Sequence, residues 1–218
     1  MDETSKSKQY WGPLEHSVVT GAGIDIGCGI DPLPGARGFD VADGDANVIT
    51  RFVKEQFDFV YSSHCLEHMH DPRKALAEWW QLVKPGGHLF FVIPDEDLYE
   101  QGVFPSRFNV DHKATFTVSK SHSWSPVSHN VLDLARELPN SELVSLALQD
   151  YGYDRRLMRH NQNPGRFVHF VELWYLRAVN HLGFHSARME AWLRQHIPQD
   201  QTLGAALAQI QCIVRKTA

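Results

Sequence analysis

The sequence predicts an α/β fold with a mostly parallel sheet, helices on both faces and an antiparallel last strand. Between residues 23 and 94, short β-branched and aromatic runs alternate with a helical pattern and with glycine and proline stops, as in parallel sheets. Residues 88–94 form a continuous apolar run, which is typical of a strand buried on both faces. With 218 residues, 43% of them hydrophobic, the chain can bury a sizeable core.

We expect a single domain over residues 1–218, with a polar N-terminal leader at residues 1–20. About residues 151–200 carry helical patterns between the last two predicted strands, so we expect a helical insertion there. Because the insertion leaves the carboxyl end of a strand, it would act as a lid on the ligand side. The broad apolar face of residues 167–182 would equally serve a dimer interface, and both roles stay open.

The first predicted strand runs into two glycines, in the sequence Gly-Ile-Asp-Ile-Gly-Cys-Gly at residues 23–29. Asp25 would stand opposite its isoleucine neighbours, at the edge where ligands bind in open α/β sheets. A carboxylate there is costly unless it is paired or meets a cation. Gly27 and Gly29 would leave room for the atoms of a ligand. The structural alternative is a glycine-rich turn with an internally satisfied Asp25.

The turn after these glycines does not suit a nicotinamide dinucleotide. Pro32 stands where the fingerprint Gly-x-Gly-x-x-Gly needs its third glycine, and Pro32 and Pro34 prevent a regular helix from starting there. A pyrophosphate at a helix N-terminus is therefore disfavoured. A ligand held by loop backbone and carboxylates is favoured.

Polar side chains close the next two strands. A strand over residues 36–41 ends near Asp40, whose carboxylate could accept hydrogen bonds from both hydroxyls of a ribose or simply form a turn. The strand over residues 57–64 ends in Ser62, Ser63 and His64. Because parallel strands end at one edge, we expect these groups beside the glycine turn.

The following elements complete the sheet. Asp71 and Pro72 predict the start of a helix over residues 72–83, with Trp79 and Trp80 in the core. Residues 84–87 predict a helix stop and a tight turn before the strand at 88–94. Further patterns predict the elements downstream: a helix over 127–138, strands over 143–148 and 208–214, and insertion helices over 167–182 and 187–196.

Two polar clusters lie beyond residue 94. Arg107, Asn109, Asp111 and His112 fall on a loop that leaves the ligand edge of the sheet, so we expect them to meet a substrate. Arg155 and Arg156, at the start of the insertion, form either a solvated face or a site for a phosphate or carboxylate of the substrate.

The motif at residues 25–29, together with residues 57–97, resembles the class I S-adenosylmethionine-dependent methyltransferases. The segment Cys65-Leu-Glu-His68 is similar to the Leu-Glu-His segment of that superfamily. The resemblance implies a Rossmann-like sheet, S-adenosylmethionine as cofactor, and in-line methyl transfer to an oxygen or nitrogen of a small acceptor.

The resemblance also implies residue roles. Gly27, Cys28 and Gly29 would face the methionine part of the cofactor, and Asp25 would lie near its ammonium group. Asp40 would hold the ribose. Asp45 would take the adenine amine, although it follows Asp40 more closely than the family pattern has it.

A narrower resemblance concerns the acceptor. Residues 31–35, 78–80 and 94–99 are similar to methyltransferases of glycan and surface-polysaccharide biosynthesis, which favours a sugar hydroxyl. If the acceptor must lose a proton, His112 or His64 is the expected general base. Two alternatives stay open: a catalytically silent S-adenosylmethionine-binding partner subunit, and a nicotinamide-dependent oxidoreductase of Rossmann type.

Composition limits the partners. The formal net charge of -5 argues against a nucleic-acid surface. Three scattered cysteines predict neither a disulfide framework nor a zinc site, and thirteen dispersed histidines lead us to expect no metal. No apolar run is long enough for a membrane span and the N-terminus does not resemble a signal peptide, so we expect a cytoplasmic protein, with a homodimer as one possible assembly.

Overall fold

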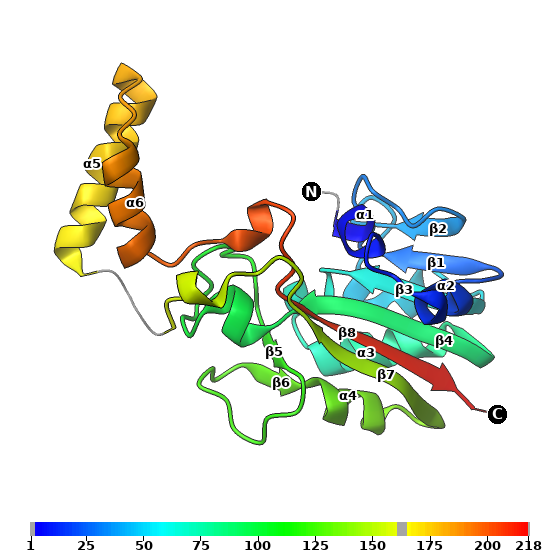
Figure 1. The fold of residues 1–218 in the computed structure, drawn as a ribbon. Helices are drawn as coiled ribbons and strands as arrows, with labels where there is room; N and C mark the ends of the chain where they lie inside the picture. The colour runs from blue at the N-terminus through cyan, green and yellow to red at the C-terminus, as the bar shows by residue number, and fades with distance from the viewer. Residues whose placement is uncertain (1–2, 161–164, 218) are drawn as a thin grey trace.

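A computed structural model of the chain describes residues 3–160 and 165–217. Within these residues, a six-stranded sheet has the order β2-β1-β3-β4-β8-β7, and a small second sheet pairs β5 with β6 (Figure 1). The strands of the main sheet are β1 (Gly23–Ile26), β2 (Ala36–Phe39), β3 (Phe57–Ser63), β4 (Val83–Pro94), β7 (Ser141–Gln149) and β8 (Gln209–Lys216). The first four are parallel, and β8 runs antiparallel to both β4 and β7. The predicted fold class is confirmed.

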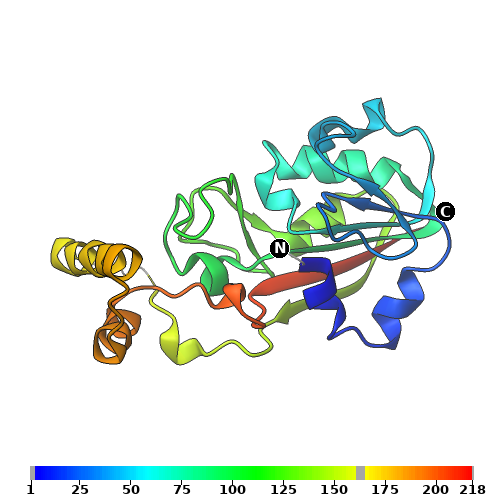
Figure 2. The same cartoon turned by 90° about the horizontal axis from the view of Figure 1, so that it is seen from above.

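Helices cover both faces of the sheet, as Figure 2 shows in a view along its edge. On one face lie α3 (Pro72–Gln81), α4 (Val131–Glu137) and the 3₁₀ helix η1 (Ala46–Arg51). On the other face lie α1 (Glu3–Lys8) and α2 (Pro13–Val18), both from the predicted leader. Residues 1 and 2 of the leader lie outside the described residues.

The core follows from side chains that alternate along β4. Leu89, Phe91 and Ile93 pack toward α3 and α4, whereas Phe90 and Val92 pack toward α2. All five are essentially inaccessible to solvent. Since a fully buried apolar side chain of this size contributes roughly 1.5 to 3 kcal/mol, this strand anchors both layers. The prediction that the apolar run at 88–94 is buried on both faces is confirmed.

Helix α3 forms for the reasons its sequence indicates. Asp71 caps it by accepting a hydrogen bond from the Lys74 amide, and Pro72 takes the first helical position. Trp79 and Trp80 are buried and pack against the sheet, and each indole donates to a backbone carbonyl outside the helix. Their prediction as core residues is confirmed.

Several element boundaries differ from the predictions by one or two residues, and two differences change which element the residues belong to. Strand β4 already begins at Val83, and residues 84–87 bulge out of it, because Val83 pairs with Phe57 while His88 pairs with Phe59. The helix expected over 127–138 begins only at Val131. The residues before it form strand β6 (Ser128–Asn130), which pairs with β5 (Thr115–Thr117).

The chain between β7 and β8 is helical. It contains η4 (Arg155–Leu157), α5 (Arg166–Leu182), α6 (Ala187–His196) and η5 (Gln201–Leu203), and residues 161–164 lie outside the described part. Figure 1 shows α5 and α6 side by side, projecting away from the sheet. Among the described residues, no helix combines the length and apolar character that crossing a membrane requires.

Candidate functional site

Two adjoining pockets lie at the carboxyl edge of the parallel strands. We call the first, of about 680 Å³, the strand-edge pocket; it is lined by Gly27, Phe39, Asp40, Val41, Gly44, Asp45, Ala46, Asn47, His64, Cys65, His68, Met69, Asp111 and Lys113. We call the second, of about 280 Å³, the loop pocket; it is lined by Glu3, Lys6, His64, Glu67, His68, Tyr99, Phe108, Asn109, His112, Asp200 and residues 202–203 and 206–209. His64 and His68 belong to both linings, so the two pockets meet there.

The glycine turn after β1 forms one wall of the strand-edge pocket. Gly27 has φ +73°, and a Cβ placed on it would lie 2.5 Å from the Cys65 sulfur, so only glycine fits. Gly29 has φ +53° but open space around it, so it is favoured by conformation alone. No helix forms between this turn and β2, as the prolines predict.

Asp25 does not line either pocket. It is completely buried, and its Oδ2 atom accepts a hydrogen bond of 2.7 Å from the Leu33 amide, while Oδ1 has no partner among the described residues. Burial, reinforced by Asp31 and Asp40, raises its pKa to about 7. We expected this carboxylate at the ligand edge; in the structure it holds the proline-rich turn from behind, because its side chain points to the opposite face of β1.

Asp40 and Asp45 do line the strand-edge pocket. The carboxylate of Asp40 accepts hydrogen bonds from the Gly29 amide (2.5 Å) and the Val41 amide (2.7 Å), which fixes it at the end of β2. Asp45 caps η1 by accepting from the Asn47 amide, and hydrogen bonds from Asn47 lower its pKa. Both oxygens of Asp40 keep a second lone pair for a ligand, whereas Asp45 Oδ1 accepts two hydrogen bonds from Asn47 and leaves Oδ2 for a ligand.

Four other residues expected at the cofactor lie behind the lining rather than in it. The Ser62 hydroxyl donates to the Ile26 carbonyl at 2.9 Å, and Ser63 is buried. Cys28 and Gly29 belong to the turn itself without lining the pocket. The side chains that line the pocket instead include Phe39, Asn47 and Met69, which were not predicted. Phe39 directly precedes Asp40, so alternation along β2 could have indicated it.

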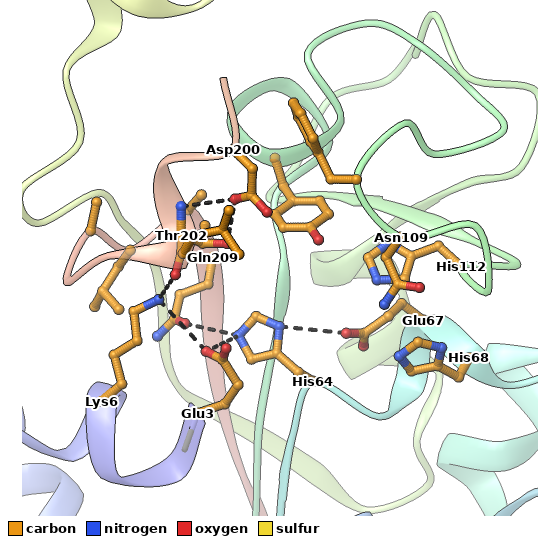
Figure 3. A pocket seen from close by; sticks show the side chains of 16 residues that line it. Glu3, Lys6, His64, Glu67, His68, Asn109, His112, Asp200, Thr202 and Gln209 are labelled. Atoms are coloured by element: carbon orange, nitrogen blue, oxygen red, sulfur yellow. Dashed lines mark hydrogen bonds and ion pairs between the residues drawn. The ribbon is translucent and has the colours of Figure 1, made fainter. Parts of the chain in front are cut away.

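His64 stands at the junction of the pockets. Its backbone has φ +52°, which is uncommon for a residue other than glycine. Its Nε2 atom lies 3.0 Å from Gln209 Oε1, and its Nδ1 atom lies 3.5 Å from Glu67 Oε1 (Figure 3). Burial lowers its pKa, but Glu67 and Glu3 outweigh burial and raise the pKa to about 9.

Two further histidines line the loop pocket, and each faces a carboxylate. His112 is buried, and its Nδ1 atom lies 2.7 Å from Glu100 Oε1. The Nδ1 atom of His68 lies 2.9 Å from Asp111 Oδ2. Both rings are thus held in fixed orientations.

The residues expected at the substrate divide into two groups. Asn109 lines the loop pocket and Asp111 lines the strand-edge pocket. Arg107 lies outside both pockets and meets Glu172 at 3.5 Å.

The two arginines at the start of the insertion belong to neither pocket. Arg155 pairs with Asp150 at 2.6 Å, and Arg156 pairs with Asp154 at 2.8 Å, in both cases near the surface. The structure therefore favours the solvated-face interpretation for these two arginines.

The sequence analysis also missed two walls of the loop pocket. Lys6 and Glu3 of α1 form one wall, and Lys6 donates a hydrogen bond of 2.6 Å to the Thr202 carbonyl on the opposite wall. The other wall is the segment just before β8, including Asp200 and Gln209. Neither segment carries a local motif, so only tertiary structure could have indicated them.

Comparisons with known proteins agree with this geometry. Residues 28–91 match the family model described as a methyltransferase domain. The chain is 38% identical over 77 residues to a ubiquinone biosynthesis O-methyltransferase from Cronobacter sakazakii, covering 32% of this chain and 31% of the relative. The family match thus covers the segment from the glycine turn through β3 and α3 into β4. The chain thus matches about a third of the length of that curated relative.

A solved structure supports the methyltransferase fold over nearly the whole chain. A protein described as a candidate sarcosine dimethylglycine methyltransferase from Galdieria sulphuraria matches with a TM-score of 0.50 and 12% identity, over 99% of this chain and 84% of the other. At this identity the match shows the fold only.

S-adenosylmethionine is the cofactor of the methyltransferase family, and the strand-edge pocket fits it in three respects. Its volume of about 680 Å³ lies within the usual range for small-molecule sites. The carboxylates of Asp40 and Asp45 face it with spare lone pairs, as hydroxyl and amine groups require. Phe39, Val41 and Met69 add apolar surface of the kind that packs against a nucleobase.

Proposed function

We propose that this chain transfers a methyl group from S-adenosylmethionine to an oxygen, or a nitrogen, of a small acceptor. The cofactor would occupy the strand-edge pocket and the acceptor would occupy the loop pocket. The observation that carries the proposal is that the two pockets meet at His64 and His68, so two ligands could approach each other there.

In this proposal Asp40 accepts hydrogen bonds from the ribose hydroxyls, and Asp45 takes the adenine amine. Gly27 keeps the turn close to Cys65 and so holds the wall of the pocket in place. Asp25 does not contact the cofactor in this proposal; it holds the proline-rich turn in place by accepting a hydrogen bond from the Leu33 amide.

When bound, S-adenosylmethionine supplies a methyl group on a sulfonium that is already strongly activated. The protein therefore contributes chiefly by position, because it holds two reactants in line and excludes water. Where the acceptor must lose a proton, His112 would accept it, since its side chain lines the loop pocket. His64 also lines this pocket, but its raised pKa leaves the ring already protonated near neutral pH.

We propose an oxygen acceptor of the sugar or glycan-precursor type. The loop pocket offers many side-chain hydrogen-bonding groups in a small volume, including Asn109, Asp200, Thr202 and Gln209. Such a lining suits a molecule with several hydroxyl groups. The Cronobacter sakazakii relative is named as an O-methyltransferase, which supports oxygen over nitrogen.

We further propose a single domain that works in the cytoplasm and forms a homodimer through α5 and α6. Cys28, Cys65 and Cys212 are all unpaired, which is consistent with a reducing compartment. Phe167, Phe170, Leu173, Trp174, Leu176 and Leu182 of α5 are exposed. An apolar surface of this kind supports a contact with a second copy more than a lid, because α5 and α6 line neither the strand-edge pocket nor the loop pocket.

Calorimetric titration tests the cofactor part. We expect S-adenosylmethionine to bind and NAD not to bind. Asp40→Ala should weaken S-adenosylmethionine binding by about 1 to 3 kcal/mol, because charge-assisted hydrogen bonds to the ribose are lost. Asp133→Ala, at an exposed position on α4, is the matched control and should bind as the wild type does.

Equal affinity of wild type and Asp40→Ala would reject the ribose role, and tight binding of NAD would reject the function. Turnover with a panel of sugar acceptors then separates an enzyme from a silent binding subunit. His112→Ala should lower turnover and leave cofactor affinity nearly intact, because His112 lines only the loop pocket.

A further inference from the structure

Glu67, His68 and His112 form a cluster beside both pockets that methyl transfer alone does not explain. One ligand atom of each residue lies within 4.8 Å of those of the other two. Glu67 and His68 belong to the 3₁₀ helix η2 (Leu66–His68), directly after β3, whereas His112 comes from the loop that follows β4. Figure 3 shows the three side chains gathered on one side of the loop pocket. Two imidazoles and one carboxylate are a donor set that binds divalent transition-metal ions.

Both histidines already have one ring nitrogen in contact with a carboxylate, as metal-bound histidines usually do. The Nδ1 atom of His112 contacts Glu100 at 2.7 Å, and the Nδ1 atom of His68 contacts Asp111 at 2.9 Å. Nε2 is therefore the ring nitrogen that each histidine has left for a ligand. A carboxylate on the far nitrogen fixes the tautomer and makes the other nitrogen a better donor to a metal.

The carboxylate of Glu67 lacks the partners that its burial requires. It is 1% exposed, and neither oxygen has a hydrogen-bond partner among the described residues. The nearest cationic group is the His64 ring, whose Nδ1 atom lies 3.5 Å away, too far for a good hydrogen bond. A buried carboxylate is strongly unfavourable unless it is paired or binds a metal.

The carboxylate is also not needed to fix the neighbouring loop. The backbone carbonyl of Glu67 accepts hydrogen bonds from the Lys113 amide (2.8 Å) and the Ala114 amide (3.3 Å). These bonds hold the segment that carries His112 without any contribution from the side chain. The Glu67 carboxylate therefore acts on the groups around the pocket, such as His64, rather than on this loop.

The charges around the cluster favour a cation. Carboxylates of Glu3, Glu100 and Asp111 contact the three histidines of the site, in addition to Glu67 itself. The cationic side chains of the two linings are Lys6, Lys113 and the His64 ring. A divalent ion at the centre would balance this excess of negative charge.

We propose that Glu67, His68 and His112 bind a divalent transition-metal ion, of the class of Zn²⁺ or Mn²⁺, at the junction of the two pockets. Imidazole ligands make Ca²⁺ and Mg²⁺ poor candidates, because both ions prefer oxygen. Three protein ligands leave at least one coordination position for an oxygen of another molecule.

The role of the ion rests on the proposed function, with His112 then acting as a ligand to the ion and water, in place of His112, accepting the proton. A hydroxyl of the acceptor bound to the ion would lose its proton to water more readily. A lone pair of that oxygen would then form the new carbon–oxygen bond, while the carbon–sulfur bond breaks and its electron pair stays on sulfur. No metal was expected from the sequence, because the ligands come from two distant segments that only the fold brings together.

Metal binding can be measured directly, without cofactor or acceptor. Protein stripped with EDTA is titrated with Co²⁺, followed by visible absorption, and with Zn²⁺, followed by calorimetry. We expect one ion per chain and Co²⁺ bands typical of nitrogen and oxygen ligands. Glu67→Gln and His112→Gln should each weaken binding by about 100-fold or more, and Asp111→Asn by about 10-fold through the second ligand shell.

His70→Gln is the matched control, because His70 is an exposed histidine close to the cluster in sequence that lines neither the strand-edge pocket nor the loop pocket. It should bind both ions as the wild type does. The proposal is overturned if the stripped wild type binds neither ion stoichiometrically, if binding survives both Glu67→Gln and His112→Gln, or if His70→Gln abolishes it. Circular dichroism checks that each variant folds. If Glu67→Gln does not fold, the titrations of the wild type and of Asp111→Asn test the proposal instead.

A parallel titration with S-adenosylmethionine separates this proposal from the proposed function. Metal binding without cofactor binding would keep the metal site and reject the methyl transfer. Cofactor binding without metal binding would reject the metal site and leave the proposed methyl transfer in place.

Discussion

The two pockets are built in different ways. The strand-edge pocket takes most of its lining from residues 27–69, and its carboxylates are already hydrogen-bonded to neighbouring backbone amides. The loop pocket gathers side chains from Glu3 to Gln209, and it contains a buried carboxylate without a hydrogen-bond partner among the described residues. A pocket made from one contiguous stretch is suited to the ligand that a whole family shares, whereas a pocket made from distant segments can change from one protein to the next.

The largest effect should come from the turn that walls the strand-edge pocket. Gly27→Ala should destabilise the fold by about 4 kcal/mol, since left-handed strain of about 1 to 2 kcal/mol adds to a clash of about 1 to 3 kcal/mol with Cys65. Gly29→Ala should cost only about 1 kcal/mol, because its Cβ would meet nothing. Urea unfolding measures both variants. Equal losses would mean that close approach to Cys65 is unimportant.

The second effect concerns Asp25, whose carboxylate supports the same turn from behind. Its pKa is raised to about 7 in the folded state, so between about pH 4 and 7 the folded chain holds a proton that the unfolded chain has released. Stability from this group is therefore present at low pH and lost as pH rises toward 7. Asp25→Asn removes that dependence and still offers an oxygen to the Leu33 amide.

Relative to wild type, Asp25→Asn should thus gain on the order of 3 kcal/mol between pH 4 and pH 8. Urea unfolding across this range gives the difference. Parallel stability profiles for the two proteins would show that the buried carboxyl does not titrate in this interval.

A smaller effect should show that a change in the loop pocket affects acceptor binding and leaves cofactor binding in the strand-edge pocket unchanged. Lys6→Met removes the hydrogen bond to Thr202 that joins the two walls of the loop pocket, and should raise the KM for the acceptor about fivefold through a loss of about 1 kcal/mol. The Kd for S-adenosylmethionine should not change, because Lys6 does not line the strand-edge pocket. A parallel rise in both constants would contradict the separation.

The smallest effect is expected outside both pockets. Arg155→Ala and Arg156→Ala remove only near-surface ion pairs with Asp150 and Asp154, which typically contribute about 0 to 1 kcal/mol. Turnover and acceptor KM should stay at the wild-type values. A marked rise in the KM for the acceptor would show that these arginines contact the acceptor after all.

The difference between a pocket built from one stretch of chain and a pocket built from distant segments explains what could be predicted from the sequence. The strand after Gly23, the cap at Asp71 and the apolar run of β4 each carry a local signal, so the sheet and the positions of Gly27, Asp40 and His64 follow from the chain itself. The sequence could not show that Asp25 lies outside both linings, because alternation tells which face a side chain takes but not which face lines a pocket.

The loop pocket could not be predicted in this way. Glu3 and Gln209 contact His64, and Lys6 lies beside Glu3, only because α1 packs across the carboxyl edge and β8 inserts between β4 and β7. The bulge at residues 84–87 is similar: the sequence Lys-Pro-Gly-Gly indicates a turn, and only the pairing with β3 shows that the strand has already begun. Such features depend on long-range register, on which local patterns carry no information.

Helix α1 has a practical consequence for anyone preparing this protein. Because Glu3 and Lys6 border the loop pocket, an affinity tag fused ahead of them would crowd its mouth. Figure 1 shows the opposite terminus at the far end of the sheet, beyond β8. A C-terminal tag would therefore lie away from both pockets. An N-terminal tag should be cleaved before binding or activity is measured.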